Sequence, residues 1–274
     1  MGAEVLYTHD LEVKALLPSL ISAIVGYTVY GTITGFEPIF GPHLRVGLAS
    51  PLELPFYALL GLLCGAVGVL YAHVFYAVAD VFRRLRLPPV LKPALGGVAV
   101  GLLGLVAPAA LHTGYGWVQE AMDHGLLSVP LWLVLLLPFA KILATGLSIG
   151  SGGSGGVFGP GIVVGGLVGV ALWRLVHGAV PHAPASPAPF VIVGMMALFG
   201  AIAHAPLAVM LMVAEMTGNL SLLASTMIAV AVATALVGDR TIYRSQLPDR
   251  SHAPLHRVRL AFPLLSPLQV RDAM

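Results

Sequence analysis

The hydrophobic pattern of this chain consists of long apolar segments separated by short connections rich in polar residues, glycine or proline. A helical residue advances about 1.5 Å, so the segment at about 54–82 is long enough to cross a hydrocarbon core of about 30 Å. We expect further apolar helices at about 15–35, 91–111, 129–147, 160–176, 189–202, 205–216 and 221–237. The pattern predicts an all-α, polytopic membrane protein, with residues 112–128 as an interfacial loop or short helix.

Two features predict tilted and broken helices in place of simple spans. Segments 189–202 and 205–216 are too short to cross a bilayer comfortably, and His204-Ala205-Pro206 separates them. Short apolar segments interrupted by Gly or Pro indicate binding sites built from helix ends near the middle of the membrane. The 32 glycines and 21 prolines also suit helices that pack closely through small residues.

Composition agrees with a membrane location. Of the 274 residues, 58% are hydrophobic and 9% are charged, whereas soluble domains carry about 25% charged residues. The formal net charge of +2 gives no indication of nucleic-acid binding. The first residues lack a basic region followed by an apolar core, so we expect no cleavable signal peptide. A single cysteine, Cys64, excludes a disulfide within the chain, and its apolar neighbours predict a small core residue.

Basic residues gather in two places outside the apolar segments. One is the connection Arg83–Lys92, and the other is the tail that follows Gly238. Because cytoplasmic loops are enriched in Lys and Arg, we expect both on the cytoplasmic side of the membrane. The C-terminus is therefore predicted to be cytoplasmic.

The stretch 148–160, Ser-Ile-Gly-Ser-Gly-Gly-Ser-Gly-Gly-Val-Phe-Gly-Pro, joins two apolar segments and carries no formal charge. Glycine lets backbone N–H groups approach a ligand closely, and Pro160 suits the first turn of a helix. A helix that begins here would direct its positive end at the turn. The turn can therefore hold an anion without a cationic side chain.

The turn also resembles a known motif. Gly156-Val157-Phe158-Gly159-Pro160 is similar to the G-x-F-x-P anion filter of CLC chloride channels and chloride/proton antiporters. The resemblance spans about residues 15–250. Other stretches that resemble the family, in the same order along the chain, are Gly104–Pro108, Ala205–Leu207, Glu215–Asn219 and Ile242–Tyr243.

The resemblance implies a membrane protein that transports chloride and is not an enzyme. It implies that chloride is the ligand, bound by backbone N–H groups at Gly156, Val157 and Phe158, with no metal and no other cofactor. The hydroxyl of Tyr243 would donate to the same anion from the cytoplasmic side. The resemblance also implies a homodimer in the plasma or inner membrane, in contact with lipid and not with nucleic acid.

The sequence also departs from the family's pattern, and these departures determine how much of the family's fold we expect in this chain. The family's membrane domain is an inverted repeat, and residues 1–245 resemble the last helix of the first half followed by the second half. The family's serine turn (G-S-G-I-P) and glutamate turn (G-[RK]-E-G-P) are absent. Residues 246–274 resemble a cytoplasmic linker and the opening of a CBS domain. We therefore expect one half of the fold, with the other half in the same polypeptide or on a separate chain.

Channel and antiporter cannot be distinguished on these residues, and two further functions stay open. Gly152-Gly153-Ser154-Gly155 fits the G-x-S-G pattern of rhomboid-type intramembrane proteases, with His204 as the base. A glycine-rich run meets this pattern easily, which disfavours the protease. A non-conducting piece that dimerises is the other alternative, because a pore at a repeat interface needs both repeats.

Four polar residues in or beside apolar segments need an explanation. We favour an interfacial acid over a proton carrier for Glu37, and a structural acid bonded to backbone groups for Glu215. His204, at a helix boundary, is predicted to be structural. Lys141 interrupts an apolar helix, and we favour a side chain that reaches an interface over a role in a pore.

Overall fold

The computed structural model describes residues 2–40, 46–48, 50–180 and 184–253, and these residues are mostly helical. The chain forms two compact units. The smaller unit is Met1–Phe36 together with Tyr243–Met274, and the larger unit is Glu37–Ile242. The predicted start of a CBS domain at 265–274 lies outside the described residues.

The smaller unit contains one long helix, α1 (Val13–Thr34), which confirms the segment expected at 15–35. It has 22 residues, and of these only Gly31 is buried. The helix ends at Gly35, whose φ of 91° is readily adopted by glycine. An apolar helix with so much exposed surface suits contact with lipid or with a partner protein, since either keeps this surface away from water.

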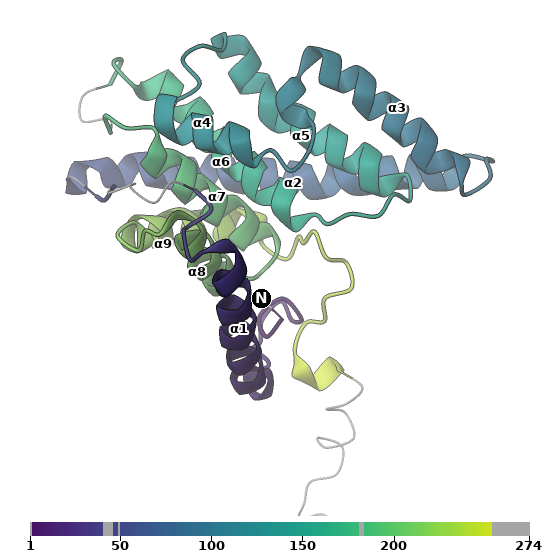
Figure 1. Ribbon diagram of the computed structural model, residues 1–274, viewed down its shortest axis with the longest axis horizontal. Coiled ribbons are helices and arrows are strands. Elements are labelled where there is room, and N and C mark those ends of the chain that lie inside the picture. Colours follow the sequence, from purple (N-terminus) through teal and green to yellow (C-terminus); the bar gives the residue numbers. More distant parts are fainter. Residues whose placement is uncertain (1, 41–45, 49, 181–183, 254–274) are drawn as a thin grey trace, which may run out of the picture. The chain divides into compact units, whose positions relative to one another are not determined.

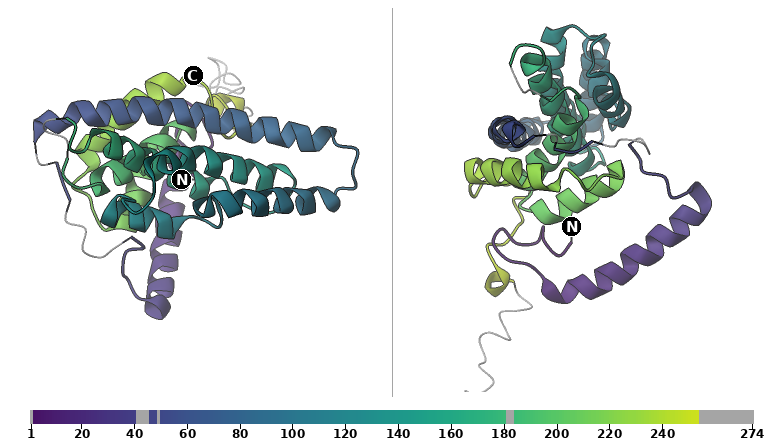
Figure 2. Two further views of the ribbon diagram at one scale, coloured as in Figure 1. Left: turned by 90° about the horizontal axis from the view of Figure 1, so that it is seen from above. Right: turned by 90° about the vertical axis from the view of Figure 1, so that its left-hand side faces the viewer.

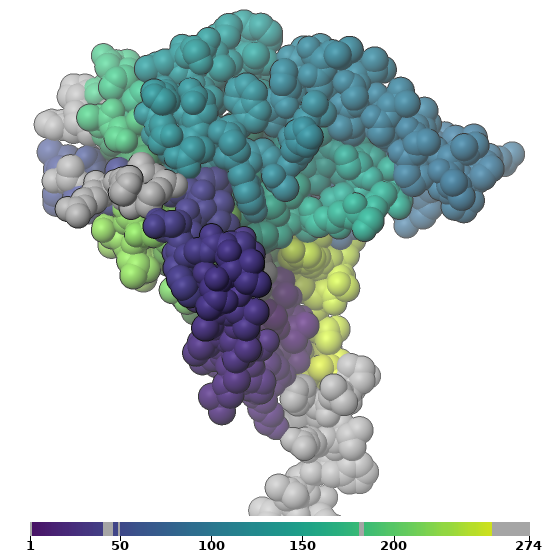
Figure 3. All heavy atoms as spheres, viewed as in Figure 1, coloured from purple at the N-terminus to yellow at the C-terminus, as the bar shows by residue number. Residues whose placement is uncertain are grey.

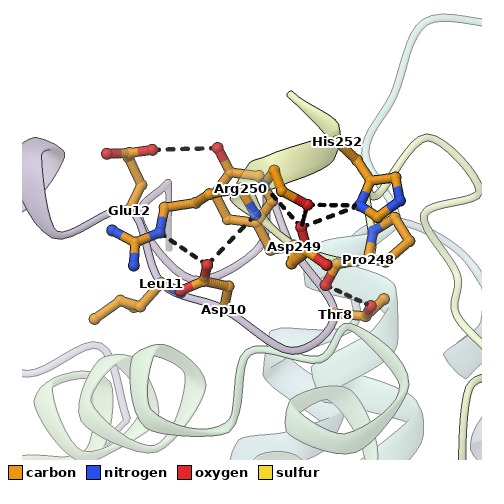
Figure 4. Close-up of polar contacts among 10 residues, drawn as sticks. Thr8, Asp10, Leu11, Glu12, Pro248, Asp249, Arg250 and His252 are labelled. Carbon is orange, nitrogen blue, oxygen red and sulfur yellow. Dashed lines mark hydrogen bonds and ion pairs between the residues drawn. The ribbon is translucent and has the colours of Figure 1, made fainter. Parts of the chain in front are cut away.

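The two ends of the chain pair with each other in the smaller unit, through residues 3–12 and 245–252 (Figure 4). We call this pairing the terminal clasp. Its backbone contacts are parallel: Thr8 N–H donates to the Leu247 carbonyl over 2.9 Å, and Leu247 N–H donates to the Leu6 carbonyl over 3.1 Å. The clasp therefore joins the residues before α1 to the residues that follow the last membrane segment.

An ion pair closes the terminal clasp. The Arg250 guanidinium Nε lies 2.8 Å from Oδ2 of Asp10 (Figure 4). The hydrogen bond from Arg250 holds the pKa of the Asp10 carboxyl below its ordinary value. Beside this pair, the Tyr7 hydroxyl donates to a carboxylate oxygen of Glu12 over 3.2 Å.

The larger unit contains eight α-helices and two short 3₁₀ turns among its described residues (Figure 1). They lie within a few residues of the predicted segments, and the interfacial stretch 112–128 includes a short helix. The elements are η1 (Pro51–Glu53), α2 (Leu54–Arg84), α3 (Leu91–Val106), η2 (Pro108–Ala110), α4 (Tyr115–His124), α5 (Leu131–Gly150), α6 (Phe158–Val176), α7 (Ala188–Ile202), α8 (Pro206–Thr217) and α9 (Leu223–Val237).

Helix α7 forms the centre of the larger unit, and each of its residues is buried. It packs against α2, α6, α8 and α9. The crossing with α6 is very close: a Cβ added to Gly165 would lie 2.3 Å from the carbonyl oxygen of Gly194. Only glycine fits at such a crossing, which confirms the expectation of close packing through small residues. Cys64 is buried with its sulfur 3.8 Å from the same carbonyl, as a core residue.

Helix α2 is the longest element, with 31 residues, and it runs alongside the core of the larger unit (Figure 2). It contacts α5, α7 and α9. Helix α3 packs against α5, and together with α4 it forms much of the visible surface of this unit in the space-filling view (Figure 3).

Four helical segments of the described chain are long and apolar enough to cross a membrane: Val13–Thr34, Pro51–Arg84, Leu131–Gly150 and Phe158–Val176. Helices α7 and α8 are shorter and meet at a sharp break. His204 has a φ of 51° there, and Ala205 N–H donates to the Gly200 carbonyl over 3.1 Å. The prediction of short, interrupted helices at 189–216 is confirmed.

The lowered pKa of Asp10 gives the terminal clasp a predicted pH dependence. The ion pair stabilises the clasp above the ordinary carboxyl pKa, and this contribution is lost as the pH falls through the lowered pKa. We expect the clasp to be most stable at neutral pH and to open more often as the pH falls from the ordinary carboxyl pKa through the lowered pKa of Asp10. Hydrogen exchange at the amides of Thr8 and Leu247, corrected for intrinsic rates, measures the opening.

The variant Asp10→Asn should exchange faster at neutral pH and lose the acid transition. Asp80→Asn is the matched control, because Asp80 pairs with Arg83 in the larger unit. Equal exchange in Asp10→Asn and the unaltered protein would contradict the role assigned to the ion pair.

Candidate anion site at the glycine turn

The glycine turn begins where α5 ends. Gly152 has a φ of 99°, and its N–H donates to the Ile149 carbonyl over 2.9 Å. A Cβ at the next residue, Gly153, would lie 2.4 Å from the carbonyl oxygen of Ser148. Glycine is therefore needed at Gly152 for its dihedral angle and at Gly153 for close approach, and together they reverse the chain direction after α5.

Helix α6 starts directly after the turn. Val157 occupies the N-cap position, and its carbonyl accepts the first helical hydrogen bond, from Gly161 N–H over 3.0 Å. Pro160 is the third residue of the helix, which confirms its predicted place in the first turn. The Phe158 ring packs edge-on against Phe199 of α7, with ring centroids 5.1 Å apart. The buried core of the larger unit therefore fixes where α6 begins.

The first N–H groups of α6 have no partner within the described part of the chain. None of the described residues accepts a hydrogen bond from the main-chain N–H of Val157, Phe158 or Gly159. Gly156 is exposed, and a Cβ added there would have no described heavy atom within 4 Å. Unpaired N–H groups and the helix dipole together give this end of α6 a partial positive charge, and anions bind at such helix ends.

Two tyrosines border the start of α6, and no motif in the sequence pointed to either. The hydroxyl of Tyr71, on α2, donates to the Val157 carbonyl over 3.0 Å. The hydroxyl of Tyr115, at the start of α4, lies 3.6 Å from the position that a Cβ of Gly159 would occupy. Both contacts join residues that are far apart in the sequence, so a local pattern could not reveal them.

Comparison with known proteins identifies the family of this chain. The sequence profile of the family described as "Voltage gated chloride channel" matches residues 1–238. The chain belongs to this family. Gly156–Pro160, which resembles a G-x-F-x-P anion-filter motif, lies within the matched residues and at the start of the buried helix α6.

Two relatives of this chain are also named as chloride channels. The chain is 36% identical over 256 residues to the voltage-gated ClC-type chloride channel ClcB of Salmonella dublin, and this match covers 93% of the chain and 59% of ClcB. It is 33% identical over 231 residues to the chloride channel protein CLC-f of Arabidopsis thaliana, covering 80% of the chain and 29% of CLC-f. The chain therefore spans less than two thirds of the length of these relatives.

Solved structures of the family share the fold. A slow cyanobacterial Cl⁻/H⁺ antiporter superposes with a TM-score of 0.68 and 28% identity, covering 77% of this chain and 50% of the antiporter. A CLC-type fluoride/proton antiporter superposes with a TM-score of 0.73 and 23% identity, covering 90% of this chain and 59% of that protein. These likenesses confirm the predicted fold: helical, membrane-spanning and one half of a CLC-type architecture.

Tyr243, the fourth predicted anion ligand of this CLC protein, belongs to the smaller unit. It is half-buried and lines a cavity of about 150 Å³ with Val5, Leu6, Ser245 and Gln246. Val157 and Phe158 belong to the larger unit, so the role of Tyr243 at the same anion stays a prediction.

The structure corrects the expectation for Lys141. This side chain does not reach an interface: it is 1% exposed, inside the larger unit. Its ammonium donates to three successive main-chain carbonyls, those of Ala110 (3.1 Å), Leu111 (3.2 Å) and His112. The sequence shows only a lysine in an apolar helix, whereas the partners come from η2 and the residues after it, about 30 positions earlier.

The structure also shows where the other three polar residues, Glu37, His204 and Glu215, lie. Glu37 is exposed, in line with the expected surface acid. His204 is structural as predicted, since its Nε2 donates to the Arg240 carbonyl over 3.1 Å. Glu215 is exposed, and none of the described residues bonds to its carboxylate. The structure thus corrects the expectation that Glu215 bonds to backbone groups; its neighbour Asn219 makes such a bond, because Nδ2 of Asn219 donates to the Val46 carbonyl over 2.7 Å.

Ser154, the nucleophile of the alternative protease hypothesis, is exposed on the turn. No described histidine forms a hydrogen bond with its hydroxyl, and His204 is bonded to the Arg240 carbonyl. A serine nucleophile needs a base within hydrogen-bond reach, so nothing in this geometry favours the protease.

The buried ammonium of Lys141 leads to a prediction about stability. Lys141→Met removes the donor from three carbonyls, of which the Ala110 carbonyl belongs to a buried residue, and an unsatisfied buried acceptor costs about 1–3 kcal/mol. We expect the melting temperature in detergent to fall by roughly 5 °C at a fixed heating rate. Lys14→Met, at an exposed lysine of α1, is the control. Identical melting of Lys141→Met and the unaltered protein would show that the three bonds contribute nothing.

Proposed function

We propose that this chain supplies the second half-repeat of a CLC-type transporter and binds chloride at the start of α6. The observation that carries the proposal is the set of main-chain N–H groups at Val157, Phe158 and Gly159, which have no acceptor among the described residues. In a region of low dielectric constant, these dipoles act on an anion much more strongly than they would in water.

The site uses no cationic side chain, and this suits transport. Conduction needs binding that is strong enough for the ion to enter and weak enough for it to leave. Backbone dipoles at a helix end meet this requirement better than a buried ammonium or guanidinium would. The open space beside Gly156 gives an ion room to approach these dipoles.

The pore itself, in this proposal, lies between two half-repeats, as in other transporters built from inverted repeats. The relatives are longer than this chain, so the first half-repeat is a partner, in the same polypeptide or as a separate chain. Tyr243 contributes its hydroxyl from the cytoplasmic side, and the basic tail after Gly238 keeps the C-terminus cytoplasmic. The complete protein is a homodimer in the plasma or inner membrane, and it works as a channel or as a chloride/proton antiporter.

Chloride flux from liposomes tests the proposal. A completed protein, in which the first half-repeat of ClcB precedes this chain, should release chloride, whereas the chain alone should not. Flux through liposomes that hold only this chain would show that the missing repeat is unnecessary. No flux in a correctly folded completed protein would remove the support for transport.

The turn is tested by Gly156→Ala in the completed protein. An added methyl group meets no described atom within 4 Å apart from its chain neighbours, so the fold should tolerate it, but it takes up part of the open space through which we propose that an ion approaches the turn. We expect the chloride flux to fall about tenfold, the equivalent of about 1.4 kcal/mol of lost anion stabilisation. Gly101→Ala on α3 is the matched control, since its Cβ also has open space. Normal flux in Gly156→Ala would show that the ion does not pass through the space beside Gly156.

A further inference from the structure

Tyr71 contacts the peptide group that we propose to face the anion. Its side chain is fully buried on α2, and its hydroxyl donates to the Val157 carbonyl over 3.0 Å. The same carbonyl accepts the N–H of Gly161 over 3.0 Å. A carbonyl oxygen has two lone pairs, so these two donors saturate it and fix its direction.

The direction of this carbonyl determines the direction of an N–H group. Val157 C=O and Phe158 N–H belong to one planar peptide unit, and no described peptide bond is cis. In a trans peptide the C=O and N–H bonds point in opposite directions. Because Gly161 of α6 and Tyr71 of α2 hold the carbonyl toward these two helices, the Phe158 N–H is held in the opposite direction, toward the turn.

We infer that Tyr71 is a positioning residue for the anion site. Its hydroxyl orients the peptide between Val157 and Phe158, so that the Phe158 N–H points at the anion before the anion arrives. This inference rests on the proposed anion site. A donor that is already oriented loses no further freedom on binding, and its affinity for the ion is higher for that reason.

Helix α2 also provides the control. The Tyr57 hydroxyl has no hydrogen-bond partner within the described part of the chain, and its side chain is fully buried like that of Tyr71. Tyr57→Phe and Tyr71→Phe therefore remove the same atom from the same helix. Only Tyr71→Phe removes a bond to the turn.

Selective isotope labelling makes the Phe158 amide visible by NMR. The chain contains three Val-Phe pairs, at 74–75, 81–82 and 157–158. Labelling valine with ¹³C at the carbonyl and phenylalanine with ¹⁵N gives one signal for each pair. With the labels confined to the residues of this chain by segmental labelling of the completed protein, two signals come from α2 and serve as internal references, and the third reports on Phe158 during a chloride titration.

We expect chloride to shift the Phe158 signal and to leave the Phe75 and Phe82 signals in place. In Tyr71→Phe, the Phe158 signal should be displaced before chloride is added, and the dissociation constant should rise about two- to tenfold, as expected for one lost hydrogen bond. Tyr57→Phe should bind chloride as the unaltered protein does.

The outcomes separate this inference from the proposed function. If chloride leaves the Phe158 signal of the unaltered protein in place, the proposed anion site fails. If chloride binds normally but Tyr71→Phe has the same affinity, or Tyr57→Phe is weakened equally, the role of Tyr71 is overturned and the anion site stands. Should Tyr71→Phe not fold, 3-fluorotyrosine at position 71 keeps the ring and strengthens the donor; an unmoved Phe158 signal there overturns the role of Tyr71.

Discussion

Backbone N–H groups without a partner are costly inside a membrane, because no water is present to bond them. The start of α6 presents three such residues, Val157, Phe158 and Gly159, without an acceptor among the described residues. A helix that begins in this way needs water, a polar cavity or a bound ligand beside it. In our proposal the partner is an anion, which satisfies the N–H groups and the helix dipole at once.

The rest of the larger unit holds this helix start in place. Helix α7 is buried along its whole length and fixes α6 through the close crossing of Gly165 and Gly194. Phe199 of α7 packs against Phe158 itself. From the other side, α2 brings the Tyr71 hydroxyl to the Val157 carbonyl. A rigid apolar scaffold thus positions a small group of backbone dipoles, and the scaffold needs no charged side chain at the site.

The elements could be predicted from the sequence, because each apolar segment and each glycine or proline break is a local signal. The turn before α6 and the start of this helix could be predicted for the same reason, because Gly156 to Pro160 are consecutive. Contacts between distant segments could not be found in this way. Lys141 is one example. Its ammonium donates to three carbonyls about 30 residues earlier in the chain, and its position in an apolar helix does not predict these partners. Tyr71 is separated from Val157 by 86 positions and has no motif of its own.

The location of a bound halide tests the central claim most directly. Bromide is chemically close to chloride and has a strong anomalous X-ray signal, so crystals of the completed protein grown in bromide would reveal its position. The account predicts an anomalous peak within hydrogen-bonding distance of the main-chain nitrogens of Val157 and Phe158. Bromide bound only at basic side chains, with the start of α6 empty or filled by a neighbouring side chain, would contradict it.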